Sequence, residues 1–218
     1  MDGRFFKFAA AVALGTATMF GATVTVSLGS NPFPTGAIGP YVANINGTND
    51  FVFCDDDTHI VYPNETWTAT VTKLSDLVAL GNISQSSVMF KNLNNALALY
   101  EEAAWLVLQF GSNGQYASGL QNALWDVFLQ KAGTGSTSDK TTDAYWLNQA
   151  ALNYTTLTDG QKQGVVFLTP VANSQRPLSD GTPQEFVMVT PEPGSYALIG
   201  TGIILLAIGT FRRKRLQS

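Results

Sequence analysis

The chain has 218 residues and a formal net charge of −4, and 13% of its residues are charged. Between positions 30 and 190, 14 acidic residues stand against 6 basic ones, a net charge of −8 that disfavours binding to the phosphates of nucleic acids. A lone cysteine, Cys54, excludes an internal disulfide, and with His59 as the single histidine the chain lacks the ligands of a zinc site. We therefore expect no nucleic-acid partner, no metal and no cofactor.

Residues 1–29 have the pattern of an export signal. Arg4 and Lys7 precede a stretch from 8 to 28 that carries no charge and is rich in Ala, Thr and Gly. A basic start followed by an apolar segment is typical of signal peptides. Cleavage after Ala22 and cleavage after Gly29 both leave small residues at the cut, and a retained membrane helix is the alternative.

The segment from 30 to 190 changes its hydrophobic period twice. After a Pro- and Gly-rich linker at 31–40, short apolar or alternating runs predict strands at 51–54, 59–62 and 67–72. The period then becomes helical, with helices expected from about 93 to 110, 120 to 129 and 143 to 153. Strand character returns at 165–168 and 186–189. This order predicts an α+β domain, a β-sandwich or barrel-like fold with a helical insertion.

The last 28 residues, 191–218, contain three features in a fixed order. Pro191, Glu192 and Pro193 come first, and an uncharged stretch from 195 to 211 follows. A basic cluster closes the chain: Arg212, Arg213, Lys214, Arg215. The uncharged stretch has nearly the length of a transmembrane helix, and the basic cluster predicts a cytoplasmic end with the domain outside.

This order of motif, apolar segment and basic end resembles the PEP-CTERM sorting signal. The resemblance implies a Gram-negative source and an exosortase-type enzyme as a partner. It also implies at least a transient tether in the inner membrane, followed by a place at the cell surface or in the extracellular matrix. Proteins with this signal are associated with exopolysaccharide and biofilm.

Cys54 and Gln121 are the residues whose surroundings suggest chemistry. Cys54 ends an apolar strand in which Val52 lies on the same face. Gln121 shares a helix face with residues at i+3, i+4 and i+7: Leu124, Trp125, Phe128. A buried amide is costly without partners. Attack of the Cys54 sulfur on the Gln121 side-chain carbonyl would expel ammonia and leave an internal thioester, an acyl group that a hydroxyl or amine could accept.

Phe53-Cys54 and the later run Gln121-Asn122-Ala123-Leu124-Trp125 resemble the thioester domain of bacterial surface adhesins over residues 50–130. The helix around 100–106 fits the helical part of that family. The resemblance implies a covalent adhesin with Cys54 and Gln121 as the reactive pair. Phe53, Leu124 and Trp125 would be their environment, and an amine-bearing surface target would be the partner.

A second interpretation of Cys54 and Gln121 involves no reaction between them. Cys54 is then a small buried side chain, as free cysteines usually are, and Gln121 bonds main-chain groups. The protein would be a structural or non-covalent component of an exopolysaccharide-containing matrix. Asp55, Asp56 and Asp57 are expected in a solvated turn rather than in a Ca²⁺ site, because no EF-hand spacing follows. The absence of a serine-nucleophile motif and of a phosphate loop argues against an enzyme with turnover.

Overall fold

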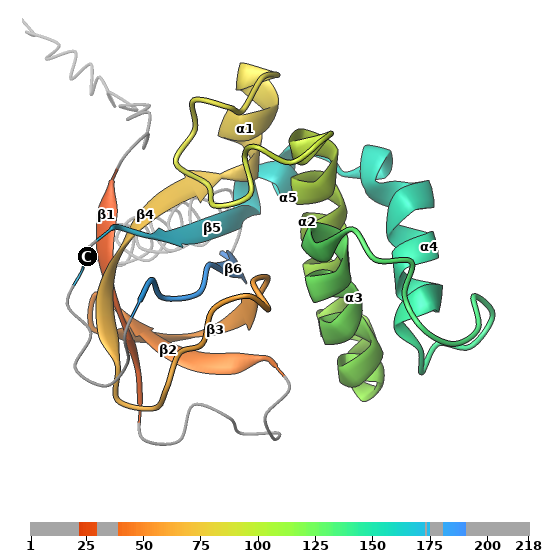
Figure 1. The fold of residues 1–218 in the computed structure, drawn as a ribbon, viewed down its shortest axis with the longest axis horizontal. Helices are drawn as coiled ribbons and strands as arrows, with labels where there is room; N and C mark the ends of the chain where they lie inside the picture. The colour runs from red at the N-terminus through yellow and green to blue at the C-terminus, as the bar shows by residue number, and fades with distance from the viewer. Residues whose placement is uncertain (1–21, 30–38, 173, 175–180, 191–218) are drawn as a thin grey trace, which may run out of the picture.

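A computed structural model describes residues 22–29, 39–172, 174 and 181–190 of the chain. Six strands close into a barrel in the order β1-β2-β3-β6-β5-β4, and every pairing is antiparallel. Figure 1 shows the barrel on one side of the molecule. The strands are β1 (Thr23–Leu28), β2 (Tyr41–Ile45), β3 (Thr48–Cys54), β4 (Thr66–Lys73), β5 (Val165–Pro170) and β6 (Phe186–Val189).

The hairpin of β2 and β3 is set by its turn. Asn46 and Gly47 have φ of 50° and 94°, the left-handed conformation that a two-residue hairpin turn requires. Their strands then pair with Tyr41 opposite Val52 and Ala43 opposite Asp50. This register carries β3 to its end at Cys54.

β1 lies within the range 1–29 that the sequence assigned to the signal segment. It pairs with β2 on one side and with β4 on the other, and Val26 and Leu28 are buried in the barrel core. A cut after Ala22 keeps this strand in the domain, whereas a cut after Gly29 removes it. The stretch up to residue 21 lies outside the described residues.

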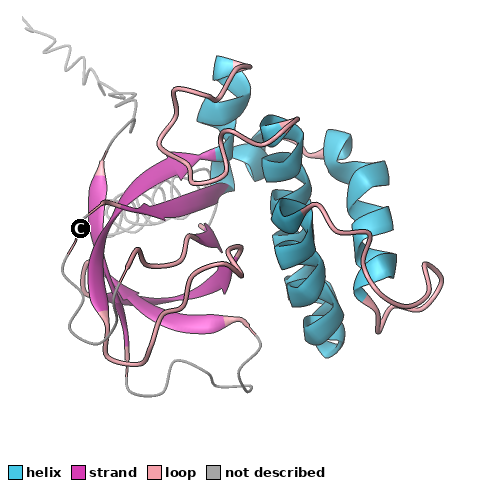
Figure 2. Cartoon of the chain, viewed as in Figure 1, coloured by secondary structure: helices cyan, strands magenta, loops and turns pink. Residues whose placement is uncertain are grey.

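The helices form a second layer against one side of the barrel (Figure 2). They are inserted between β4 and β5: α1 (Leu74–Leu80), α2 (Ala96–Asn113), α3 (Ala117–Leu129), α4 (Asp143–Asn153) and α5 (Asp159–Gly164). The Phe53 ring lies 4.4 Å from Phe110 of α2, and the Tyr100 ring of α2 lies 4.7 Å from Phe167 of β5. The predicted α+β barrel-like fold with a helical insertion is confirmed.

Strand alternation divides the buried residues between two cores. Val52, Cys54 and Phe186 belong to the core inside the barrel, and Phe53 and Val187 belong to the core between barrel and helices. The two cores arise because successive side chains of β3 and β6 point to opposite faces. Cys54 therefore points into the barrel, on the same strand face as Val52, and that shared face was predicted.

Two predictions around Cys54 are wrong. Residues 59–62 form no strand but lie in a loop from 55 to 65, where the Nδ1 atom of His59 is 2.6 Å from the Asp56 carboxylate. Asp55 and Asp56 are fully buried rather than solvated, and Asp57 alone of the three is exposed. The helices α1 and α5 had no counterpart in the prediction.

None of the helices within 22–29, 39–172 and 181–190 is long and apolar enough to cross a membrane. The predicted sorting tail, with Pro191, Glu192, Pro193, the apolar stretch and the basic cluster, lies outside the described residues.

Candidate functional site

The fold brings Gln121 and Cys54 together from positions 67 residues apart. The Nε2 amide of Gln121, on α3, donates a hydrogen bond of 2.5 Å to the main-chain carbonyl oxygen of Cys54, at the end of β3. Both side chains are buried, with exposed fractions of 0% and 1%. The two residues that the sequence paired are therefore in direct contact in a site closed to water.

The thiol of Cys54 is held in its neutral form. It donates a hydrogen bond of 3.1 Å to the main-chain oxygen of Asp56. Burial, followed by the neighbouring Asp55 carboxyl group, raises the pKa of the Cys54 thiol well above its ordinary value, while the hydrogen bond with the Asp56 main chain acts in the opposite direction. A thiol in this state is a poor nucleophile toward solutes and resists ionisation until its surroundings change.

The Gln121 side chain is only half satisfied. Its Oε1 atom is buried and has no hydrogen-bond donor among the described residues. That oxygen lies against Gly39, where an added β-carbon would come within 2.5 Å of it. A buried carbonyl without a donor costs about 1–3 kcal/mol, so this amide is held in place by the packing around it.

The three residues expected around the pair, Phe53, Leu124 and Trp125, are divided between the two cores. Trp125 is half-buried and packs against the barrel core that contains Cys54. Phe53 and Leu124 are buried in the other core, between barrel and helices. Trp125 thus forms part of the surroundings of the Cys54–Gln121 pair, while Phe53 and Leu124 support the strand and the helix that carry the pair.

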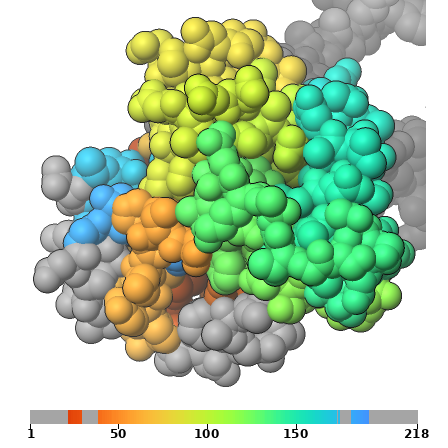
Figure 3. Space-filling model, turned by 45° about the vertical axis from the view of Figure 1, so that its right-hand side comes forward, coloured from red at the N-terminus to blue at the C-terminus, as the bar shows by residue number. Residues whose placement is uncertain are grey.

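Trp125, which packs against the barrel core, also lines a cavity of about 400 Å³. Its lining comes from the loop after β3, from α3 and from the connection to α4: Asp57, Asn122, Trp125, Asp126, Lys131, Ala132, Gly133, Thr134, Asp143. Figure 3 shows the segment that follows β3, in orange, beside the α3 region, in green. Carboxylates outnumber amines in the lining of the cavity.

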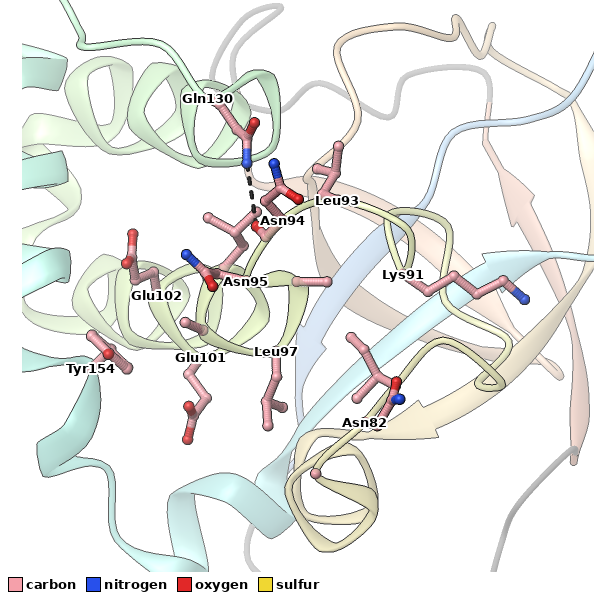
Figure 4. A pocket seen from close by; sticks show the side chains of 15 residues that line it. Asn82, Lys91, Leu93, Asn94, Asn95, Leu97, Glu101, Glu102, Gln130 and Tyr154 are labelled. Atoms are coloured by element: carbon pink, nitrogen blue, oxygen red, sulfur yellow. Dashed lines mark hydrogen bonds between the residues drawn. The ribbon is translucent and has the colours of Figure 1, made fainter.

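A larger groove of about 820 Å³ lies elsewhere (Figure 4). It lies between the α1–α2 connection and α2, where Gln130 Nε2 donates a 3.3 Å hydrogen bond to the Asn94 main-chain oxygen. Its lining includes neither Cys54 nor Gln121. We therefore place the candidate site at the Cys54–Gln121 pair and not in the larger groove.

Sequence reasoning missed the acidic residues behind the pair. Asp55 and Glu185 are fully buried, and Glu185 accepts a hydrogen bond of 2.7 Å from the Tyr100 hydroxyl. No group of three or more metal-ligating side chains gathers in the part of the chain that the structure describes. The acidic character of the 55–57 run was visible in the sequence, but the burial of Asp55 depends on the pairing of β3 with β6.

Comparison with known proteins gives one structural likeness. The chain matches no family model and no curated protein. It is similar in fold to the N-terminal thioester domain of a protein F2 like fibronectin-binding protein from Streptococcus pneumoniae, with a TM-score of 0.39 and 12% identity over 77% of this chain and 92% of that one. A likeness at this level carries no information about chemistry. The fold and site define an α+β barrel domain with a buried Cys–Gln pair.

Proposed function

We propose that this chain is an exported surface or biofilm-matrix protein whose domain forms an internal thioester between Cys54 and Gln121 and uses it for covalent adhesion. The observation that carries the proposal is the direct contact of the Gln121 amide with Cys54 in a site closed to solvent. A single cysteine in an exported domain has no disulfide partner within the chain, and this pairing gives it a role.

The bond forms without any other reactant. The Cys54 sulfur attacks the Gln121 side-chain carbon, the carbon–nitrogen bond breaks, and ammonia leaves with the thiol proton. The new acyl–sulfur bond is neutral and removes the ionisable thiol from the barrel core. Exclusion of water from the buried site preserves the thioester against hydrolysis.

An amine-bearing target completes the reaction. A primary amine attacks the acyl carbon, an amide forms to Gln121, and Cys54 is released as a thiol, so the product is a covalent link to the target. The cavity beside Trp125 favours a cationic group, because three carboxylates line it, from Asp57, Asp126 and Asp143, and its lining includes one lysine, Lys131. Burial and the neighbouring Asp143 carboxylate raise the pKa of Asp126, as crowding of acids without enough cations does.

Sorting is the second part of the proposal. It rests on Pro191, Glu192 and Pro193, the uncharged stretch and the basic cluster that begins at Arg212. An exosortase-type enzyme would recognise this tail at the inner membrane and pass the domain to the surface or matrix.

The competing function is a non-covalent matrix component. The hydrogen bond from Gln121 to the Cys54 carbonyl favours it, since that bond gives the amide a structural role without chemistry. The two functions differ in the state of the thiol. Under the thioester proposal, Cys54 in freshly purified, denatured chain resists alkylation by iodoacetamide until methylamine is added. Immediate alkylation of the untreated chain rejects the thioester and leaves the non-covalent function.

A further inference from the structure

Two buried acids, Asp55 and Glu185, lie next to the Cys54–Gln121 site. In the β3–β6 pairing, Phe53 faces Val187 and Cys54 faces Phe186, so the next facing positions are Asp55 and Glu185. The β-carbons of residues in facing positions of antiparallel strands lie about 5 Å apart. The following pair in this register, Asp56 and Gln184, is also in contact. The side-chain amide of Gln184 donates a hydrogen bond of 2.7 Å to the Asp56 main-chain oxygen.

Glu185 is well supplied with donors. The Tyr100 hydroxyl donates to its Oε1 at 2.7 Å, and the Met89 main-chain N–H donates to its Oε2 at 2.9 Å. Thr169, which faces Glu185 from β5, donates its hydroxyl to the same Oε2. A carboxylate with three donors from three separate segments is suited to carry the negative charge of the pair.

Asp55 has the opposite surroundings. Both of its carboxylate oxygens are buried and neither has a donor within the described part of the chain. The groups that face the two acids are Cys54, Asp56 and Tyr100, and none of them is a cation. The charge of Asp56 is already engaged by Thr58 and His59. No lysine or arginine of the described residues forms an ion pair with either acid.

We infer that Asp55 and Glu185 hold one proton between them, with Asp55 as the donor, and that this bond fixes the end of β3 that carries Cys54. Two facing carboxylates without a cation cannot both be ionised in a buried site, and one proton converts their repulsion into a charge-assisted hydrogen bond. Asp55 and Glu185 are then positioning residues for Cys54. The inference goes beyond the thioester, because the bond forms whether or not Cys54 reacts.

Because of this pair, the stability of the fold should decrease as the pH rises. Burial, followed by the charge of Glu185, raises the pKa of Asp55 well above its usual value, so Asp55 is the acid that keeps the shared proton. A carboxyl group whose pKa is higher in the folded chain than in the unfolded chain stabilises the folded state. This stabilisation is complete when the pH lies below the pKa of the group in the unfolded chain. That stabilisation begins to fall as the pH rises past the unfolded pKa of an aspartate, about 4, and it is lost once the pH passes the folded pKa of Asp55.

The test uses the full-length chain with Cys54→Ala, so that thioester chemistry cannot contribute. Thermal melts between pH 5 and pH 8 compare this parent with the same chain carrying Asp55→Asn or Asp57→Asn. The amide that Asp55→Asn introduces donates a hydrogen to Glu185 at every pH. We therefore expect the parent and the Asp57→Asn control to lose about 5–10 °C as the pH rises and the Asp55→Asn chain to lose little of this. Parallel profiles for all three chains would overturn the inference.

A second measurement covers the case in which Asp55→Asn does not fold. Infrared spectra of the parent at pH 6 should contain the carbonyl stretch of a buried, protonated carboxyl group, and the band should disappear as the pH is raised. A parent without this band at pH 6 has no shared proton and also overturns the inference. Neither result depends on the thioester, so failure of the proposed function would leave this test unaffected.

Discussion

Gly39 packs directly on the side chain of Gln121, with room for a hydrogen atom and for nothing larger. A β-carbon at position 39 would lie 2.5 Å from Gln121 Oε1 and 3.3 Å from the Tyr41 ring. The glycine is therefore required by the close approach of the amide. It fixes one side of the Gln121 group while the Cys54 carbonyl fixes the other.

Gly39→Ala should displace Gln121 from Cys54. We expect a stability loss of about 1–3 kcal/mol from overpacking and a strong reduction in the fraction of chains that take up methylamine. Chemical denaturation and mass spectrometry measure the two effects. Gly111→Ala in α2 is the control, since nothing lies within 4 Å of a β-carbon there, and it should leave uptake unchanged. Full uptake by the Gly39→Ala chain would show that the contact does not position the amide.

Trp125 should protect the thioester from water. Because its indole packs on the barrel core and lines the outer cavity, Trp125→Ala should raise the fraction of chains with a hydrolysed thioester and a free thiol several-fold on storage. Trp125→Phe, which keeps most of the bulk, should lie between this variant and the parent. Thiol titration over time measures the fraction. Leu152→Ala, at a residue 67% exposed, is the control. Equal hydrolysis in all four chains would exclude a shielding role.

Tyr100→Phe should destabilise the fold, and neither Cys54 nor Gln121 is changed by it. The Tyr100 hydroxyl donates to Glu185 and accepts from the Phe90 main-chain N–H at 2.9 Å, so its loss leaves the buried Glu185 carboxylate and the half-buried Phe90 N–H each short of a partner. The expected cost is about 1–3 kcal/mol in the free energy of unfolding, measured by urea denaturation. Tyr62→Phe, at a residue 46% exposed, should cost far less. Equal costs would mean that the Tyr100 hydroxyl contributes nothing to the core.

Deletion of residues 191–218 should release the domain from the membrane. The tail carries the uncharged stretch and the basic cluster that begins at Arg212, which together predict the anchor. Fractionation of cells that express the full and the truncated chain measures the distribution. A truncated chain that remains with the membrane after removal of the signal segment would show that the anchor lies elsewhere.

The sequence predicted the features that local patterns determine. Alternation along β3 placed Cys54 on the face of Val52, and the helical period placed Gln121 with Leu124 and Phe128, and both assignments are confirmed. The helix over 143–153 is confirmed with Thr142 as its N-cap. These features depend on the periods of strand and helix, which a single segment contains.

Features that depend on strand pairing were not predictable. Glu185 meets Asp55 only because β6 closes the barrel beside β3, and Gly39 meets Gln121 only because α3 lies against the barrel end. The strand β1 was not predicted, because it lies in an apolar N-terminal run where a strand and a signal segment have similar composition. His59 was placed in a strand by its apolar neighbours, but the bond to Asp56 turns the chain there.

The most direct test of the thioester is the intact mass of the chain before and after methylamine. If the bond forms, wild type gains about 31 Da as methylamine adds across it, and Cys54 becomes alkylatable at the same time. Cys54→Ala and Gln121→Ala should gain nothing, and before treatment wild type should weigh about 17 Da, one ammonia, less than its sequence predicts for the same chain ends. A wild-type chain whose mass and thiol reactivity are unchanged by methylamine would contradict the proposed function.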